Sequence, residues 1–246
     1  MNTYKKNSKA GSLKQTVLAL AALALFSLPL LAGTGRRVAF AVGVGEYTEY
    51  PALKAAAGDA HTISRALTGR GFDAVDTLTD ADVSYSHLLE GITELANELD
   101  DNDLLVLYVA AHGWVDNSDG TALILPATTR RGFEREDGID LAKLVREVSS
   151  LTAARIVVML DACFAGAFDL THNEERLTFW AGARANEWAF EDKDHGLFTG
   201  QLLKYLHGKS RYDISASVTQ GVIRETGGWQ RPELNPHADH SALALL

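Results

Sequence analysis

Residues 155–166 read RIVVMLDACFAG, and this stretch decides the fold. Five apolar residues follow Arg155, and the first three are β-branched, which predicts a short strand buried on both faces of a parallel sheet. The strand is followed by Cys163, the only cysteine in the 246-residue chain. In open parallel sheets, reactive groups collect beyond the carboxyl ends of the strands, so Cys163 occupies the place of a nucleophile.

A second apolar strand, DLLVLYVAA at residues 103–111, ends in His112 and Gly113. A thiol of ordinary pKa is mostly protonated at neutral pH, so a catalytic cysteine needs an adjacent base. We therefore predict His112 as the general base of Cys163, and the backbone amides of Gly113 and Cys163 as donors to an oxyanion. The alternative is that Cys163 is a buried, space-filling thiol and His112 ends a strand at an ordinary turn.

The N-terminal segment differs from the rest of the chain. Residues 1–32 carry four lysines and no acidic residue, and an apolar run at 16–32 ends beside the small residues 33–35. This pattern predicts a signal peptide, and hence an exported protein, periplasmic or secreted. A signal anchor retained in the inner membrane is the alternative, although the run is slightly short for a span.

The charge of the chain argues against nucleic acid as a partner. The formal net charge is −9, and it becomes −13 when residues 1–32 are removed. An acidic globule of this kind repels a phosphate backbone. Contact with a membrane is expected only through an uncleaved N-terminal segment, and the oligomeric state stays open.

Apolar periodicity along the chain alternates between strand and helix. This order is typical of a largely parallel α/β sandwich with one core. A mobile loop is expected at 168–182, and Asp80 or Asp82 is expected to cap the second helix. The expected strands are 37–45, 72–78, 103–111, 121–126 and 155–161, with a strand-like piece at 188–190, and the expected helices are 53–68, 83–99, one from 138, 197–206 and 214–224.

Four motifs in this order resemble those of the caspase-like cysteine peptidases, closest to their bacterial and metacaspase-type branch. They are LKAAAGDA at 53–60, LYVAAHG at 107–113, LDACFAG at 160–166 and HGLFT at 195–199. The resemblance implies a caspase-like three-layer sandwich, an α/β fold with a mostly parallel six-stranded sheet and helices on both faces. It also implies that residues 36–246 form the peptidase domain.

By this resemblance the protein is a cysteine endopeptidase that hydrolyses polypeptide substrates through a dyad of Cys163 and His112. In metacaspase-like members, the aspartates at the places of Asp59 and Asp161 bind the arginine or lysine that precedes the scissile bond. Two carboxylates at a strand end can hold a guanidinium by charge-assisted hydrogen bonds. The structural alternative is a helix cap for Asp59 and binding of loop amides for Asp161.

The chain departs from the family pattern beside both catalytic motifs. Ala110 and Ala111 stand where serine and glycine are common, and Phe164 and Ala165 stand where histidine or arginine and then serine are common. A catalytically inactive binding or scaffold module therefore remains one alternative, and an active member with aspartate specificity is another.

Self-processing is a further hypothesis, because Arg176 and Arg184 fall in or just after the expected loop. The dyad requires no cofactor, and we predict no metal site. Some family members require calcium, and Asp116 and Asp119 supply carboxylates in a turn, although their spacing matches no EF-hand loop. The tail sequence HADH at 237–240 is predicted to be a solvated terminus rather than a metal site.

Overall fold

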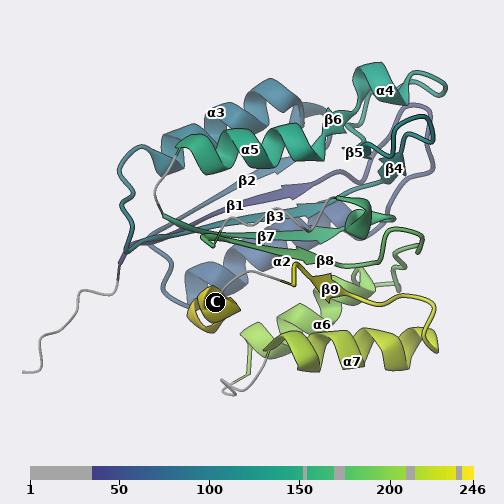
Figure 1. Ribbon diagram of the computed structural model, residues 1–246. Coiled ribbons are helices and arrows are strands. Elements are labelled where there is room, and N and C mark those ends of the chain that lie inside the picture. The colour runs from purple at the N-terminus through teal and green to yellow at the C-terminus, as the bar shows by residue number, and fades with distance from the viewer. Residues whose placement is uncertain (1–34, 152–153, 169–174, 209–213, 237–239) are drawn as a thin grey trace, which may run out of the picture. The chain divides into compact units, whose positions relative to one another are not determined.

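The central element of the computed structural model is a six-stranded sheet with the order β2-β1-β3-β7-β8-β9 (Figure 1). Neighbouring strands run parallel except β9, which is antiparallel to β8. The structure describes residues 35–151, 154–168, 175–208, 214–236 and 240–246. The strands of this sheet are β1 (Arg37–Gly43), β2 (Ala74–Thr79), β3 (Leu104–Ala110), β7 (Arg155–Asp161), β8 (Leu177–Ala181) and β9 (Glu233–Leu234).

Helices cover both faces of the sheet, which confirms the predicted three-layer α/β sandwich (Figure 1). One face carries α3 (Tyr85–Ala96) and α5 (Leu141–Leu151), and the other carries α2 (Ala56–Gly69), α6 (Leu197–Leu206) and α7 (Ile214–Thr226). A separate three-stranded sheet follows β3 in the chain. Its strands are β4 (Gly113–Val115), β5 (Ala122–Ile124) and β6 (Ile139–Asp140), and the remaining short elements are α4 (Glu134–Asp137), η1 (Asp80–Asp82), η2 (Ala165–Ala167) and η3 (His240–Leu245).

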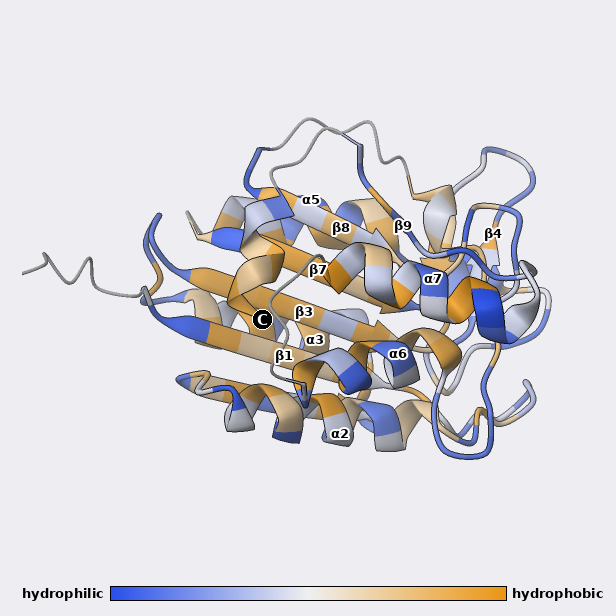
Figure 2. Ribbon diagram, turned by 90° about the horizontal axis from the view of Figure 1, so that it is seen from below, coloured by the Kyte–Doolittle hydropathy of each residue, from blue (hydrophilic) through white to orange (hydrophobic). Residues whose placement is uncertain are grey.

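Strand β3 shows how the sheet is buried on both faces. Leu105 and Leu107 belong to the core beneath α3 and α5, whereas Leu104 and Val106 belong to the core beneath α2, α6 and α7. Burial of one such side chain stabilises the fold by about 1.5–3 kcal/mol. A strand without charged residues therefore lies at the centre of the sandwich, where Figure 2 shows β1, β3 and β7 coloured mainly as hydrophobic.

The prediction of a mobile loop at 168–182 is wrong for the second half of this range. Residues Leu177–Ala181 form β8, and all five are buried. Phe179 stacks on Phe168 on one face, while Trp180 meets Phe198 edge to face on the other. These contacts lie on both faces of the sheet, so the short apolar run pairs with β7 as a strand. Residues 169–174 lie outside the described residues.

The prediction of a strand-like piece at 188–190 is also wrong, since these residues form no strand. The two helix starts differ as well. Helix α2 begins at Ala56 rather than at residue 53, and α3 is capped by Ser84, whose hydroxyl accepts the His87 amide at 3.2 Å. Neither predicted aspartate caps α3, and the carboxylate of Asp80 instead accepts the amide of Gly45 at 2.8 Å. Asp80 ties the end of β1 to the end of β2.

The predicted signal peptide or anchor at residues 1–32 lies outside the described residues. Residues Gly35–Leu246 form one compact unit. Within the described part of the chain, no helix combines the length and the apolar character that crossing a membrane requires.

Candidate active site

The register of β3 and β7 brings the two predicted catalytic side chains to neighbouring strand ends. The strands run parallel with Ala110 opposite Asp161, so His112 and Cys163 each follow that pair by two residues. Gly113 lies directly against the Cys163 carbonyl, because a Cβ at residue 113 would stand 2.0 Å from that oxygen. The structure therefore gathers His112, Gly113 and Cys163 at one edge of the sheet.

Tyr47 and Pro51, in the loop after β1, orient His112. The backbone N–H of His112 donates to the Tyr47 hydroxyl at 2.8 Å, and the imidazole packs on the Tyr47 ring with centroids 4.6 Å apart. Nε2 of His112 lies 2.8 Å from the Pro51 carbonyl oxygen. Because a carbonyl oxygen can only accept, we assign the proton to Nε2, which leaves Nδ1 of the neutral ring as the basic nitrogen.

Cys163 is half-buried, and its thiol contacts the backbone of Ala189. The amide of Ala189 lies 3.4 Å from Sγ, and Sγ lies 3.8 Å from the Ala189 carbonyl oxygen. Burial raises the pKa of the Cys163 thiol, and the neighbouring charge of Asp161 raises it further. The thiol is therefore protonated at rest, and its use as a nucleophile requires a base.

The hydrogen-bond pattern of β4 and β5 bears on the prediction that the Gly113 amide is an oxyanion donor. Leu125 donates its amide to the His112 carbonyl at 3.0 Å, which makes Gly113 and Ile124 a pair without mutual hydrogen bonds in the β4–β5 ladder. The Gly113 N–H consequently takes no part in that ladder. After Cys163 the backbone turns through a left-handed residue, Phe164, with φ of 59°.

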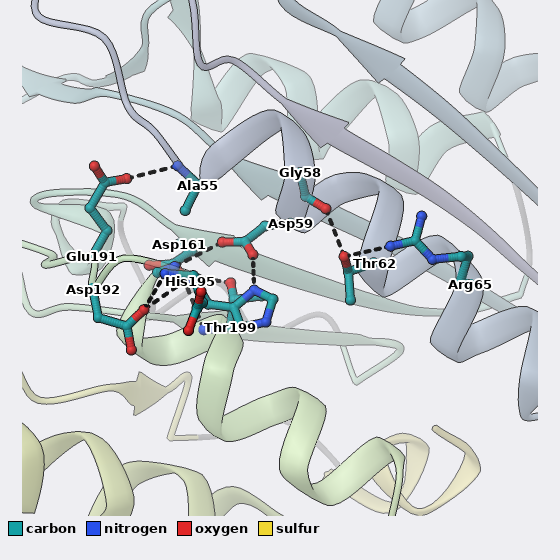
Figure 3. Close-up of polar contacts among 12 residues, drawn as sticks. Ala55, Gly58, Asp59, Thr62, Arg65, Asp161, Glu191, Asp192, His195 and Thr199 are labelled. Atoms are coloured by element: carbon teal, nitrogen blue, oxygen red, sulfur yellow. Dashed lines mark hydrogen bonds and ion pairs between the residues drawn. The ribbon is translucent and has the colours of Figure 1, made fainter.

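The N-terminus of α6 holds the two predicted substrate-binding carboxylates (Figure 3). Asp59 accepts the Gly196 amide at 2.8 Å and contacts Nδ1 of His195 at 2.5 Å. Asp161 accepts the amide of Thr199 at 3.1 Å and its hydroxyl at 2.6 Å. Amides at the start of a helix favour negative charge, so α6 stabilises the ionised form of both acids.

Burial opposes this stabilisation. Burial raises the pKa of Asp161 to about 6. The hydrogen bonds from Thr199 lower this pKa, and repulsion from Asp59 raises it. Burial also raises the pKa of Asp59, while Gly196 and His195 limit the rise. Both carboxylates are almost fully buried. The helix cap considered as the alternative for Asp59 is not formed at α2, which has no side-chain cap. Asp161 does bind a backbone amide, as its alternative expected, but the amide is that of Thr199 in α6 and not one of a loop.

A cavity of about 50 Å³ joins these groups. Its lining includes His112, Cys163, Asp59, Asp161 and Glu191, so the structure brings together all the predicted site residues that carry reactive or charged side chains. Glu191 was not predicted, and its carboxylate accepts the amides of Lys54 and Ala55 at 3.1 Å, just before α2. Figure 3 shows the bond from Ala55. The cavity is acidic and has the thiol at one side.

The HGLFT motif at 195–199 contains residues of the site whose role was not predicted. His195, Gly196 and Thr199 are the residues that bind the two aspartates, a role that was not assigned to them from the sequence. Tyr47 and Ala189 carried no such signal, because each acts through a loop contact with a distant segment.

Asp116 and Asp119, the two turn carboxylates considered for calcium, contact other residues in the structure. The guanidinium of Arg135 lies 3.0 Å from Asp119 and 3.8 Å from Asp116. Hydrogen bonds from the hydroxyl and then the amide of Ser118 lower the pKa of Asp116. Bonds from the side chain and then the amide of Thr121 lower the pKa of Asp119. Across the described residues, no group of three or more histidine, cysteine or acidic side chains is arranged to hold a metal ion. Residues 237–239 of the tail lie outside them.

A mostly parallel sheet with a cysteine and a histidine at adjoining strand ends defines an α/β protein of caspase-like architecture. The caspase domain (peptidase C14) family model matches residues 36–242, and the chain belongs to this family. It therefore carries a caspase-like peptidase domain.

Known proteins resemble the chain at low identity. Mucosa-associated lymphoid tissue lymphoma translocation protein 1 of Homo sapiens is 23% identical over 203 residues, which cover 78% of this chain and 24% of that protein. The Mus musculus homolog is also 23% identical, so the chain spans about a quarter of the length of these relatives.

Two solved structures share the fold. Protein GSU0716 from Geobacter sulfurreducens has a TM-score of 0.65 at 16% identity, over 85% of this chain and 96% of its own. Caspase-1 from Spodoptera frugiperda has a TM-score of 0.61 at 13% identity, over 83% and 88%. These similarities extend to the fold alone.

Proposed function

We propose that the protein is a cysteine endopeptidase that cleaves polypeptides after arginine or lysine, with Cys163 as nucleophile and His112 as general base. The observation that carries this proposal is the acidic cavity, which Cys163 and His112 line together with Asp59 and Asp161. A basic substrate side chain among the carboxylates would present the following carbonyl to the thiol.

The reaction proceeds in two balanced halves. Nδ1 of His112 takes the thiol proton while Sγ of Cys163 attacks the carbonyl carbon, and the amides of Gly113 and Cys163 stabilise the oxyanion. Collapse of this intermediate breaks the C–N bond, and the imidazolium protonates the leaving amine, which leaves a thioester on Cys163. Water then gives a proton to His112 and attacks the thioester, which releases the carboxylic acid and restores the thiol.

Charge supports the choice of a basic substrate residue. Asp59, Asp161 and Glu191 line the cavity, and a guanidinium or ammonium would offset their mutual repulsion. A carboxylate side chain would add to that repulsion, which argues against the aspartate-specific alternative. The mostly buried position of the two aspartates strengthens their interaction with a bound cation.

Substrate binding requires the site to open. The cavity of about 50 Å³ is far below the range of about 300–1,000 Å³ that holds small-molecule ligands. Ala189 lies against the thiol from the segment after β8, so a substrate must displace the Ala189 contact with Sγ. We expect binding to move this segment.

The discriminating experiment is a positional scan of fluorogenic peptide substrates with wild-type and Cys163→Ala protein, with and without a calcium chelator. Thiol-dependent cleavage after arginine and lysine is expected, in the presence or absence of the chelator. Preference for aspartate, or no reaction of Cys163 with a thiol-reactive peptide probe under reducing conditions, would favour one of the two alternatives.

We further propose that residues 1–32 direct export, and N-terminal sequencing of the mature protein tests whether they are cleaved or retained as an anchor. Intact-mass analysis of wild-type and Cys163→Ala protein tests self-processing. Both arginines are exposed, and each backbone carbonyl accepts an amide. The Arg176 carbonyl accepts the Ile156 amide of β7 at 2.7 Å, whereas the Arg184 carbonyl accepts the Glu187 amide at 3.1 Å in a turn outside the sheet. Because a turn separates from its neighbours more easily than the sheet does, we expect any thiol-dependent cut to follow Arg184.

A further inference from the structure

A buried chain of three polar side chains leads from the acidic cavity into the core of the protein. Tyr108 of β3 and Thr199 of α6 are fully buried, and Asp161 at the end of β7 lines the cavity. The Tyr108 hydroxyl lies 2.6 Å from Oγ1 of Thr199, and this Oγ1 lies 2.6 Å from Oδ2 of Asp161. Figure 3 shows Thr199 beside Asp161. The chain thus connects a carboxylate of the candidate site with a phenol that does not line the cavity.

The protons of this chain have one consistent direction when Asp161 is ionised. A carboxylate can only accept, so the single hydroxyl proton of Thr199 is donated to Asp161, and the Tyr108 hydroxyl must donate to Thr199. Burial raises the pKa of Tyr108, and the charge of Asp161 raises it further, so the phenol keeps the proton that it donates. Each bond polarises the next, and both favour the charged form of Asp161.

The two carboxylate oxygens of Asp161 have different surroundings. Oδ2 accepts both the amide and the hydroxyl of Thr199, whereas Oδ1 has no hydrogen-bond partner among the described residues. A Cβ at Gly196 would lie 2.3 Å from Oδ2, so the glycine permits the close approach of the α6 N-terminus. One oxygen is therefore anchored by α6, and the other is left to accept a hydrogen bond from a ligand.

The charges around the cavity do not stabilise the ionised form of Asp161. Burial raises the pKa of Asp161, and the negative charges of Asp59 and Glu191 raise it further. The described residues that line the cavity include no lysine or arginine. The ionisable groups around Asp161 are Asp59 on α2 with its partner His195, Glu191 after β8, Cys163 after β7, and Tyr108 and His112 on and after β3. The charge of Asp161 therefore depends on the donors that α6 and β3 supply.

We propose that Tyr108 is a positioning residue for substrate binding, which acts through the Thr199 hydroxyl to hold Asp161 ionised and oriented toward the basic side chain of the substrate. This inference rests on the proposed function, since it concerns the same acidic cavity. Tyr108 touches no substrate, because its side chain is fully buried in the core beneath α2, α6 and α7. The preference of the cavity for a cation thus depends on a hydroxyl that lies outside it.

The test measures kcat/KM for an arginyl peptide and for its citrulline counterpart from about pH 5 to about pH 8.5. The ratio of the two values isolates the charge of the cavity, since Cys163 and His112 act on both peptides alike. In wild-type protein the ratio should rise with pH as Asp161 ionises, with its midpoint at about 6.

Two conservative variants remove the hydroxyls one at a time. Thr199→Val should move the midpoint upward by about one pH unit, because it removes a hydrogen bond to a charged group. Tyr108→Phe keeps the ring and should move the midpoint upward by about half a unit, since its hydroxyl acts through Thr199. Both changes should appear in KM for the arginyl peptide rather than in kcat, and Thr199→Ser, which keeps a hydroxyl, should restore the wild-type midpoint.

Tyr85→Phe is the matched control for Tyr108→Phe. The Tyr85 hydroxyl is buried and has no hydrogen-bond partner within the described part of the chain. Tyr85 belongs to α3 and packs against the core on the opposite face of the sheet. This variant should therefore keep the wild-type midpoint and the wild-type kinetic constants. Circular dichroism verifies that each variant is folded.

The outcomes separate this inference from the proposed function. Cleavage after arginine with a wild-type midpoint in Tyr108→Phe would overturn the role of Tyr108 and leave the peptidase standing, whether or not Thr199→Val shifts the midpoint. Equal losses of kcat/KM for both peptides at an unchanged midpoint would show that the chain only supports the fold, and would also overturn it. Absence of thiol-dependent arginyl cleavage in wild-type protein would remove the proposed function and this inference with it.

Discussion

Gly113 and Cys163 touch through their backbones: the position of a Cβ on residue 113 lies 2.0 Å from the carbonyl oxygen of Cys163. A real side chain there would overlap main chain, which cannot rotate away. We therefore predict that Gly113→Ala lowers the free energy of unfolding by about 1–3 kcal/mol and strongly reduces peptidase activity, because the strand ends must separate.

Gly58 is the matched control for this substitution. It lies within α2, and a Cβ at residue 58 meets nothing within 4 Å. Gly58→Ala should stabilise the protein by up to about 1 kcal/mol, the difference in helix propensity between the two residues. Chemical denaturation of both variants checks the pair, and equal stability of Gly113→Ala and wild-type protein would contradict the packing described.

Tyr47 is predicted to position His112 through its hydroxyl, which accepts the His112 amide and donates to the Leu125 carbonyl at 3.2 Å. Tyr47→Phe removes both bonds and should cost about 1–3 kcal/mol of stability together with a fall in kcat. Tyr50→Phe loses a hydroxyl bonded to the half-buried Glu134 and not to the His112 backbone, so it should lower stability less than Tyr47→Phe does and leave kcat unchanged. Steady-state kinetics and denaturation of the two variants decide the matter, and a wild-type kcat in Tyr47→Phe would refute this role.

Asp161 is predicted to make stability depend on pH. Its pKa is about 6 in the folded protein against an ordinary value of 3.8, so the folded state holds this proton more tightly than the unfolded chain does. The corresponding stabilisation is complete below about pH 4 and is lost as the pH rises through about 6. A shift of this size corresponds to about 3 kcal/mol, as an upper bound.

At pH 7.5 the free energy of unfolding of Asp161→Asn should therefore exceed that of wild-type protein by about 1–3 kcal/mol. The difference should shrink as the pH is lowered to 4, because wild-type Asp161 is then neutral as well. Denaturation curves across this pH range provide the measurement. A constant difference between the two proteins would exclude titration of Asp161 as its cause.

The same acids should control the affinity for basic substrates. Asp59→Asn and Asp161→Asn should each raise KM for an arginyl peptide by about tenfold with a smaller change in kcat, because the lost charge acts in the ground state and the transition state alike. A citrulline peptide, which lacks the charge, serves as the control and should be little affected. In wild-type protein, KM for the arginyl peptide should also rise below about pH 6. A fall in kcat without a change in KM would argue against substrate binding by these residues.

The sequence was sufficient for the sheet centre and the strand-end pair. Short, continuous apolar runs rich in β-branched residues are typical of central parallel strands, and β3 and β7 end in register, which is why His112 and Cys163 lie at the same end of the sheet. Strand β8 could not be predicted with the same rule. Its five residues include Thr178, and the strand depends on neighbours on both faces rather than on a local pattern.

The surroundings of the site were beyond prediction for a different reason. Tyr47 lies 65 residues from His112, and Ala189 lies 26 residues from Cys163, so their contacts arise when separate loops pack over the strand ends. Loops carry no periodicity from which such contacts could be inferred. The contacts of His195 with Asp59 and of Thr199 with Asp161 could have been predicted, because both His195 and Thr199 belong to a recognised motif.

The central claim is that Cys163 and His112 act together on peptides with a basic residue before the scissile bond. Its most direct test is the rate of hydrolysis of a fluorogenic arginyl peptide by wild-type, Cys163→Ala and His112→Ala protein, each verified as folded. We predict cleavage by wild-type protein and a loss of about a thousandfold or more in kcat in each variant. Equal hydrolysis by Cys163→Ala and wild-type protein would contradict the account.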